Sequence, residues 1–321
     1  MALQVLLKNN RNIVLCSFLG CKELILYEFY YLCNMKKLLT ILLLFFTAHS
    51  FAQDWIAPPG STFKNPHRDT LGMSYIRVMY SHKYMPDTLA RDNFDKYAAV
   101  LHVCKDGLSK YEEYARFLFD SLAYLKTKNY EILVEDHNAI SRKVGNFRSN
   151  GLRLYKNHPE RGKILNVEYT GIVEFYYYTQ DKPQFNWSVR FDSIQTILEH
   201  QCMYAEGQYA GRTWRVWFTP EVPVSEGPWK LCGLPGLILK AEDAKGEFFF
   251  NAFAIMNNES GVTACGLSDM FTTKREQFLK LKEKKEVNLK QQFLSSGKFT
   301  TSVPVKTSIA DIRPYNPIEF Y

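Results

Sequence analysis

Residues 211–243, Gly-Arg-Thr-Trp-Arg-Val-Trp-Phe-Thr-Pro-Glu-Val-Pro-Val-Ser-Glu-Gly-Pro-Trp-Lys-Leu-Cys-Gly-Leu-Pro-Gly-Leu-Ile-Leu-Lys-Ala-Glu-Asp, are the stretch of this 321-residue chain that decides the fold. Apolar and polar residues alternate through 213–219, which places Trp214 and Phe218 on one face of a half-buried strand. Residues 237–241 have the composition of a second strand. The stretch therefore predicts two strands that are joined by a long irregular connection.

Prolines and glycines shape the connection between those two strands. Pro223 and the pair Gly227-Pro228 force irregular backbone, because proline donates no amide hydrogen bond and restrains the residue before it to extended conformations. The run Leu234-Pro235-Gly236 suits a type II turn, in which Pro235 presets φ and Gly236 supplies a positive φ. Three of the five tryptophans lie in 211–243, so we expect large rings to pack on this fixed backbone.

Residues 227–240 resemble the signature of the GLPGLI family, exported proteins of Gram-negative bacteria named after the hexapeptide that stands here at 233–238. The structural signature consists of Gly227, Pro228, Trp229, Gly233, Leu234, Pro235, Gly236, Leu237 and Ile238. Further positions that resemble the family are Gly211-Arg212, Trp214, residues 217–221, Ser109-Lys110-Tyr111 and residues 314–319. The resemblance covers most of the mature chain. It implies export, and it implies no particular reaction, ligand or catalytic residue.

A secretory signal peptide is predicted at residues 35–52. Two lysines follow Met35, residues 38–46 are an apolar run too short to span a bilayer, and Ser50-Phe51-Ala52 is a small-x-small cleavage site before Gln53. We therefore expect the mature protein in the periplasm.

Two segments flank this signal peptide. Residues 1–34 are interpreted as an upstream extension from a mis-set start codon. The competing interpretation is a membrane anchor at 13–31, which is disfavoured because charged residues interrupt it. Residues 53–321 contain no linker and no internal repeat, so we expect a single domain without a stable membrane span.

Hydrophobic periodicity predicts a β-rich α+β fold. Strands are expected at 73–80, 93–103, 164–172, 175–179, 186–192, 213–219, 237–241 and 247–255. Apolar residues that recur every three to four positions predict helices at 111–126 and 272–294, while residues 129–147 fit no single pattern. We predict a single curved antiparallel sheet, covered by about two helices, in which the last three of these strands lie together.

Bulk composition and standard motifs narrow the function only slightly. The formal net charge of +7 is ordinary, and no basic cluster is interleaved with aromatic residues, so no nucleic-acid partner is expected. Gly-x-Ser-x-Gly, His-Glu-x-x-His, Walker and Gly-x-Gly-x-x-Gly patterns are absent. Their absence lowers the expectation of an enzyme without excluding one, because catalytic groups need only meet in space.

The candidate binding residues in the 211–243 stretch are Arg212, Trp214, Arg215, Trp217, Glu221, Trp229 and Lys230. The charged members suit a small anionic ligand with tryptophans beside it. The alternative is a structural corner of tryptophans and Gly-Pro turns with arginines stacked on the rings. The chain also has 20 Tyr and 23 Phe, which suit the lining of a concave face. We therefore favour a non-enzymatic envelope protein that binds a partner or small ligand, with an outer-membrane receptor as a candidate partner in uptake.

Cys202 allows three interpretations. His200 and Cys202 share one face of a strand, which suits a periplasmic hydrolase or thiol enzyme. Cys202 and Cys232 each precede one of the two strands of the 211–243 stretch, so a disulfide between them is an alternative in an oxidising compartment. The third interpretation is that both are free, buried thiols.

A soft-metal site is the remaining alternative. Met73, Met79, His82 and Met85 are the kind of side chains that hold copper(I). Met73 and Met79 would lie about 20 Å apart along a strand, so one site uses both only if the chain bends. The sequence therefore predicts no bound metal and no cofactor.

Overall fold

The computed structural model describes residues 58–65, 68–145, 151–170, 174–264, 266–268, 270–287 and 315–320. The chain divides into two units, Met1–Pro59 and Gly60–Tyr321, and the fold described below is that of the second. The predicted signal peptide at 35–52 and the extension at 1–34 lie outside the described residues.

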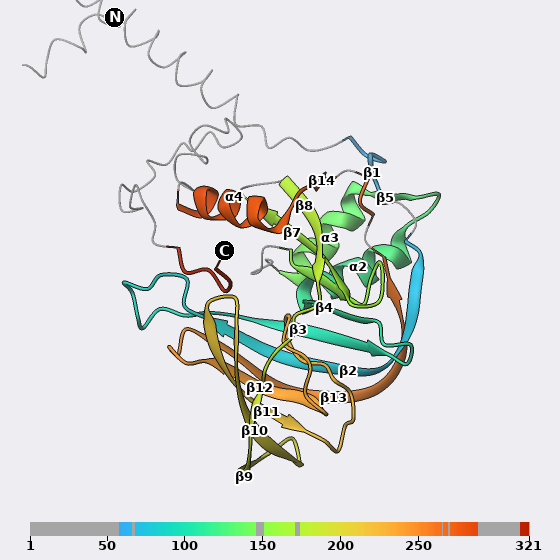
Figure 1. The fold of residues 1–321 in the computed structure, drawn as a ribbon. Coiled ribbons are helices and arrows are strands. Elements are labelled where there is room, and N and C mark those ends of the chain that lie inside the picture. The colour runs from blue at the N-terminus through green and yellow to red at the C-terminus, as the bar shows by residue number, and fades with distance from the viewer. Residues whose placement is uncertain are drawn as a thin grey trace, which may run out of the picture. The chain divides into compact units, whose positions relative to one another are not determined.

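A large sheet of 12 strands dominates the second unit, in the order β14-β8-β7-β6-β4-β3-β2-β13-β12-β11-β10-β9 (Figure 1). Its strands are β2 (Thr70–Tyr84), β3 (Asp95–Cys104), β4 (Ser109–Glu113), β6 (Arg153–Lys156), β7 (Lys163–Thr170), β8 (Glu174–Asp181), β9 (Ser188–Ile197), β10 (His200–Tyr209), β11 (Arg212–Thr219), β12 (Leu237–Asp243), β13 (Phe248–Thr263) and β14 (Phe271–Thr272). The short strands β1 (Thr62–Lys64) and β5 (Glu131–Leu133) form a separate pair.

The β-rich class and the neighbourhood of the three strands around the signature are confirmed. β11 pairs with β12 and β12 pairs with β13, all antiparallel. Trp214 and Phe218 are fully buried on β11, as the alternation predicts. Leu237, Ile238 and Leu239 are also fully buried, so β12 is covered on both faces and lies inside the sheet rather than at its edge.

The prediction of one antiparallel sheet with about two helices is too simple. β14 runs parallel to β8, β1 and β5 lie outside the large sheet, and three helices are described. These helices are α2 (Tyr114–Lys126), α3 (Val134–Val144) and α4 (Arg275–Val287). α3 falls in the ambiguous region 129–147, where acidic residues in the first turn, basic residues in the last turn and Gly145 at φ 82° complete a short helix.

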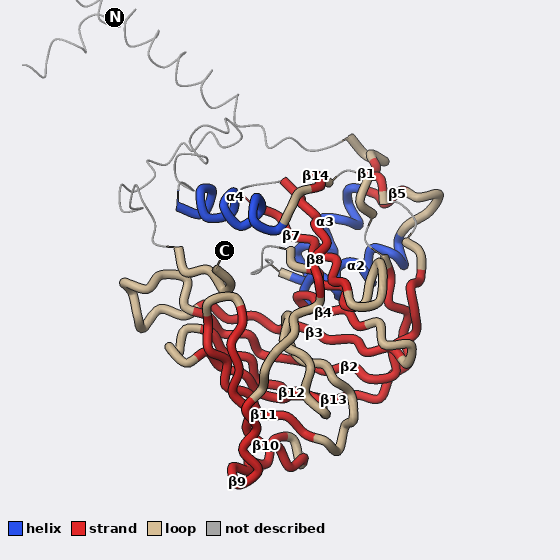
Figure 2. The backbone as a smooth tube through the Cα atoms, in the orientation of Figure 1, coloured by secondary structure: helices blue, strands red, loops and turns tan. Residues whose placement is uncertain are grey.

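Irregular pairing lets the longest strands bend. The ladder between β13 and β2 shifts register between Ala252 and Ala254 and again between Asn257 and Ser260. Such bulges add local twist and turn a strand out of plane. In Figures 1 and 2, β2 and β13 curve strongly, and the sheet curves with them.

The helices cover two opposite faces of the sheet. α2 contacts β3 and β4 and packs against α3, while α4 contacts β7 and β8 (Figure 2). Residues of β4 alternate between these faces: Lys110 and Glu112 line a cleft beneath α2, whereas Tyr111 lines a cavity together with Leu279 of α4. β4 is buried along its whole length, so both faces of this strand lie in potential sites.

The three described helices were compared with the requirements of a membrane-spanning helix. None of the helices placed there combines the length and the apolar character that a membrane crossing requires.

Candidate functional site

The signature forms a tight corner between β11 and β12, and Gly236 is required there for a reason other than the predicted one. Gly236 is not at positive φ; Gly233, with φ 94°, holds that conformation. A Cβ atom on Gly236 would lie 2.2 Å from the carbonyl oxygen of Thr219. The predicted type II turn is therefore wrong at Gly236, because the approach of the neighbouring strand leaves no room for a side chain.

Arg212 is a buried anchor for the end of the chain. Its Nη1 lies 2.7 Å from Asp243 Oδ2 and 2.8 Å from Glu247 Oε2. Its Nη2 donates to Asn316 Oδ1 at 2.6 Å, and its Nε donates to the carbonyl oxygen of Pro317 at 3.1 Å. These bonds tie β11 to the C-terminal residues 315–320.

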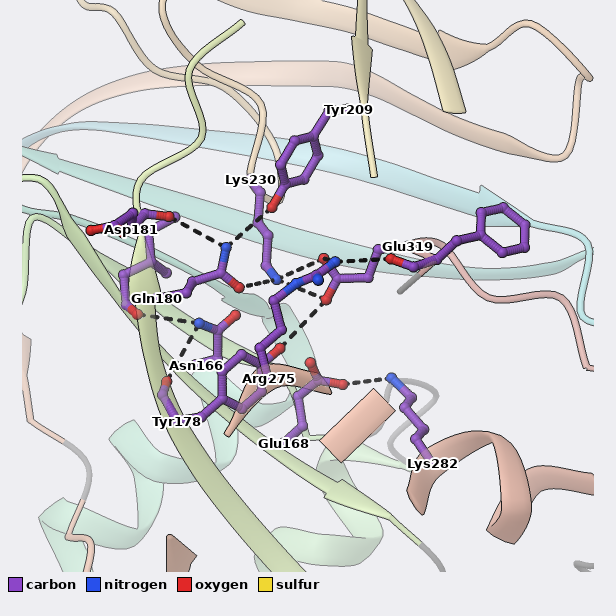
Figure 3. A network of polar contacts seen from close by, with 12 residues as sticks. Asn166, Glu168, Tyr178, Gln180, Asp181, Tyr209, Lys230, Arg275, Lys282 and Glu319 are labelled. Atoms are coloured by element: carbon purple, nitrogen blue, oxygen red, sulfur yellow. Dashed lines mark hydrogen bonds and ion pairs between the residues drawn. The ribbon is translucent and has the colours of Figure 1, made fainter. Parts of the chain in front are cut away.

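Lys230 holds the same C-terminal segment from a second point. Its Nζ lies 2.8 Å from Glu319 Oε1 and also donates to Gln180 Oε1, and Arg275 of α4 lies 3.6 Å from the same carboxylate (Figure 3). Burial tends to raise the pKa of Glu319, but the adjacent Lys230 ammonium brings that pKa below its usual value. Lys230 is fully buried, and the Glu319 carboxylate supplies the counter-charge that a buried ammonium requires.

The seven candidate residues of the 211–243 stretch do not form one site. Arg212, Trp214, Trp229 and Lys230 are buried. Arg215 and Trp217 alternate with Trp214 and lie on the other face of β11, where Arg215 pairs with Glu206 at 3.3 Å and Trp217 carries Lys240 Nζ 4.0 Å above its ring.

Glu221 lies just beyond the end of β11 and accepts hydrogen bonds from β10. His200 Nδ1 is 2.7 Å from Glu221 Oε2, and the Gln201 amide donates to Glu221 Oε1 at 3.0 Å. Arg212, Arg215 and Glu221 thus have ion-pair partners within the protein, and ligand binding by the seven candidates stays a prediction.

The two cysteines of the signature region are separate, buried free thiols, so the Cys202–Cys232 disulfide is not formed. The Cys202 thiol donates to the backbone carbonyl of His200, and the Cys232 thiol donates to that of Pro183. Burial raises the pKa of Cys202 to about 11, so little thiolate is present at neutral pH. The His200 ring pairs with Glu221 instead, which leaves a thiol enzyme without an activated nucleophile.

The methionines proposed for copper(I) are distributed over different surroundings. Met73 is exposed, whereas Met79 and Met85 are buried. Met79 and His82 are three residues apart on β2 and face opposite sides of the sheet. The His82 ring stacks on Phe250 at 4.2 Å. Among the described residues, no group of three or more His, Cys, Asp or Glu side chains is arranged to hold a metal ion.

A cavity of about 110 Å³ lies beneath the C-terminal segment. Tyr111, Trp229, Asn316 and Glu319 contribute to its lining, so three of the motifs that carry the family resemblance meet here. A space of this volume suits a few ordered waters rather than a larger ligand.

The α2 cleft, with a volume of about 880 Å³, is much roomier than the cavity beneath the C-terminal segment. It lies between α2 and the face of the sheet that carries His102, Lys110 and Glu112. The side chains that line it are those of Asn65, Arg68, His102, Lys110, Glu112, Phe117, Asp120, Ser121, Tyr124, Leu125, Thr127, Asn129, Tyr130, Val262 and Thr263. None of these was a candidate from sequence, although Lys110 belongs to the Ser-Lys-Tyr motif.

His102 is the unusual member of this cleft. The residue is 2% exposed, and neither ring nitrogen has a hydrogen-bond partner among the described residues. Its ring lies 4.9 Å from that of Phe117. Burial, with smaller effects of Lys110 and Arg77, lowers the pKa of His102 to about 3, so the imidazole is neutral at pH 7. A neutral imidazole has one donor nitrogen and one acceptor nitrogen, and in His102 both are buried.

The buried histidines predict a pH dependence of stability. Burial also lowers the pKa of His82 to about 3, whereas a histidine in the unfolded chain titrates near 6.5. The unfolded state therefore binds more protons below pH 6.5, and each histidine stabilises the fold fully above that pH and progressively less as the pH falls towards 3. We expect the free energy of unfolding to fall between pH 6.5 and 5 by up to about 1.4 kcal/mol per pH unit for each histidine.

Urea unfolding at pH 7, 6.5, 6, 5.5 and 5 checks this expectation. A His102→Gln variant should show a shallower pH dependence than the wild type, while a His200→Gln variant serves as the control for loss of a partly exposed histidine. Equal slopes for the wild type and His102→Gln would contradict the assignment.

A known protein family matches only part of the chain. Residues 187–240 match a family described as "Protein of unknown function (Porph_ging)", which fits an uncharacterised family and spans β9 to the middle of β12. No curated protein matches the chain.

Two solved structures of PNGF-II show weak similarity to the chain. The structure in space group P21 gives a TM-score of 0.42 at 11% identity, covering 67% of this chain and 34% of that one. The structure in space group C2 gives a TM-score of 0.38 at 11% identity, covering 68% and 32%. The chain thus spans about a third of the length of PNGF-II.

Proposed function

We propose that this protein is an exported cell-envelope protein that holds a small ligand in the α2 cleft. Export to the periplasm is supported by the signal-peptide pattern at 35–52. Ligand binding is supported by His102, a buried side chain that lines the cleft without a hydrogen-bond partner among the described residues. A buried polar group in this state carries a desolvation cost, which a bound ligand offsets.

The size and lining of the cleft agree with this proposal. Its volume of about 880 Å³ falls within the range of small-molecule sites. Polar groups are concentrated on the sheet side, whereas Phe117, Tyr124 and Leu125 of α2 add apolar surface. A few fixed polar groups beside apolar walls are the usual design of a ligand pocket.

Binding fits the structure better than the other two functions. The buried Cys202 thiol, with a pKa near 11, does not support a thiol enzyme, and the dispersed methionines do not support a copper site. We further propose that an outer-membrane receptor or another envelope protein exchanges the ligand with this protein. An exported binding protein needs such a partner to take part in uptake.

Native mass spectrometry of the protein from the periplasmic fraction of its own host tests both parts of the proposal. We expect a chain that begins at Gln53 and carries a small molecule. Ser121→Trp should fill the cleft from α2 and remove the bound mass, while Ser121→Ala, which leaves the cleft open, should retain it. A bound mass that survives in Ser121→Trp would refute the site, and a chain that begins at Met35 would refute cleavage.

A further inference from the structure

Two rows of side chains cross one face of the large sheet, from β9 to β3. Residues directly opposite each other in antiparallel strands project from the same face, so the register fixes both rows. The first row is Arg190, Tyr204, Trp217, Lys240, Asn251, Ser81 and Ala98, and the second is Ser188, Glu206, Arg215, Glu242, Phe249, Lys83 and Lys96. We call these two rows the open face.

The open face is accessible along its whole length in the described structure. None of its side chains is buried, whereas the positions that alternate with them, such as Ala205 and Val216, are fully buried. The three described helices contact β3, β4, β5, β7 and β8, and in Figure 2 none of them lies beside β9 to β12. Neighbouring strands lie about 4.8 Å apart, so the open face extends about 29 Å across its seven strands.

Positive charge exceeds negative charge on the open face. Its cations are Lys83, Lys96, Arg190, Arg215 and Lys240, and its carboxylates are those of Glu206 and Glu242. Arg215 pairs with Glu206 at 3.3 Å, and the other four cations have no ion-pair partner among the described residues. Asp192 lies in a bulge at 191–193 whose residues have no partner in β10. Five cations against three carboxylates still leave an excess of positive charge when Asp192 is counted.

Lys83 and Lys96 form a like-charge pair at the β2–β3 end of the open face. The two lysines are directly opposite each other, an arrangement that destabilises a sheet. Asp95 does not relieve the repulsion, because it projects from the other face and accepts a hydrogen bond from the Tyr84 hydroxyl at 3.3 Å. The pair therefore lacks a counter-charge among the described residues, and an anionic partner supplies one.

Aromatic rings hold three of the cations in place. Each of these cations lies over a ring centre: Lys240 over Trp217 at 4.0 Å, Lys83 over Phe94 at 4.0 Å and Arg190 over Tyr204 at 5.4 Å. The charges are thus positioned before a partner arrives, which reduces the entropy cost of binding an anion. The same contacts occupy ring faces on which a nucleic-acid base would stack, so the open face favours recognition of charge over stacking of bases.

Polar groups between the cations indicate a partner that is rich in hydroxyl groups. The side chains of Glu242 and Asn251 make no hydrogen bond among the described residues, and both offer oxygens that accept from hydroxyl groups. A membrane surface suits the open face less well. Proteins that dock on a membrane insert apolar side chains about 5–10 Å into it, whereas Trp217 and Phe249 are half-buried beside cations.

From these charges and contacts we infer that the open face binds a linear acidic polysaccharide that lies across the strands. Its carboxylate or sulfate groups pair with the cations of the open face, and its hydroxyl groups donate to Glu242 and Asn251. None of the side chains of the open face lines the α2 cleft. The inference therefore goes beyond the proposed function and stands without it.

Four hexamers test the inference by isothermal titration calorimetry on the purified protein: hexagalacturonate, its fully methyl-esterified form, a heparin hexasaccharide and hexaglutamate. We expect an acidic oligosaccharide to bind, and the methyl ester, which keeps the sugar rings without their charge, and hexaglutamate to bind about tenfold more weakly or worse. A rise in NaCl from about 50 to 500 mM should weaken the binding by about tenfold, because salt screens exposed charges. Tighter binding of hexagalacturonate than of the heparin hexasaccharide would assign carboxylate groups to the natural partner, and the reverse order sulfate groups.

Variants locate the binding surface. The double variant Lys83→Gln/Lys240→Gln should weaken binding of the acidic oligosaccharide by about tenfold or more, since it removes two charged hydrogen-bond donors. It should fold, because neither lysine is buried and the loss of Lys83 relieves its repulsion with Lys96. Lys128→Gln/Lys143→Gln is the matched control; it removes the same charge from exposed positions outside the open face and should bind like the wild type.

The outcomes separate the polysaccharide class from the surface. Equal affinity for hexagalacturonate and its methyl ester, tighter binding of hexaglutamate, or no binding of either acidic oligosaccharide up to about 1 mM would each overturn the polysaccharide class. Sedimentation with phosphatidylglycerol vesicles in place of oligosaccharide binding would assign the open face to an anionic membrane instead.

The α2 cleft is tested independently by Ser121→Trp, which should leave oligosaccharide binding unchanged. Binding that Ser121→Trp abolishes and Lys83→Gln/Lys240→Gln leaves intact would overturn the open face and place the oligosaccharide in the α2 cleft. Binding that neither change weakens would overturn the open face as well. Binding that the Lys83→Gln/Lys240→Gln variant alone weakens would establish the open face, whether or not the α2 cleft holds a ligand.

Discussion

Replacing Arg212 with alanine is expected to destabilise the protein by about 3–5 kcal/mol, because it breaks a buried ion pair and leaves charge behind. The Arg212 side chain is 1% exposed and lies between Asp243 and Glu247. The same change removes the hydrogen bonds to Asn316 and Pro317. The expected result is therefore a lower urea midpoint and faster proteolysis near the C-terminus.

Arg215→Ala is the matched control for this prediction. Arg215 lies on the opposite face of the same strand, 42% exposed, and pairs with Glu206. An exposed ion pair of this kind contributes about 0.2–1 kcal/mol. A cost for Arg212→Ala that is no larger than the cost for Arg215→Ala would show that Arg212 is not the anchor of the C-terminal segment.

The strands around the signature were predictable because their side-chain pattern is local. Trp214 and Phe218 alternate with polar residues, and Leu237 to Leu239 form a continuous apolar run, so burial on one face or on two follows from the sequence itself. The pairing of β12 with β13 follows from the short connection at residues 244–247, whereas β11 and β12 pair across the long irregular connection at residues 220–236.

Other elements depend on contacts that sequence patterns do not show. The role of the C-terminal residues 315–320 comes from Arg212, which lies 105 positions before Pro317 in the chain. The strand expected at 186–192 extends from Ser188 to Ile197, because β9 at the edge of the sheet has few buried positions to mark its end. Helix α3 is short and weakly apolar, with Ile140 its one buried residue.

The α2 cleft was not predictable because it needs the register of three strands. Arg77, His102 and Lys110 are separated by 25 and 8 positions in the chain, and only the pairing of β2, β3 and β4 brings them into one row. The one local signal is strand β4, where Lys110 and Glu112 alternate with Tyr111. Charged residues inside a buried strand indicate a polar site on one face.

Gly236→Ala is expected to cost about 3 kcal/mol or more, at the upper end of the range for overpacking, or to prevent folding. The new Cβ atom would lie 2.2 Å from the Thr219 carbonyl oxygen and 2.9 Å from the Pro220 nitrogen. Both atoms belong to the backbone, and Thr219 is directly opposite Leu237 in the β11–β12 ladder. Relief therefore requires the two strands of the signature to move apart.

Gly233→Ala separates the steric conflict at Gly236 from the backbone strain that a side chain causes at a positive φ. Gly233 has φ 94°, but its nearest neighbour to an added Cβ is Trp187 Nε1 at 3.6 Å, an ordinary contact. The cost there comes from the backbone conformation and amounts to about 1–2 kcal/mol. Urea unfolding of both variants should thus rank Gly236→Ala as the more damaging. The opposite ranking would mean that backbone conformation, and not the close approach of β11, explains the glycines of the signature.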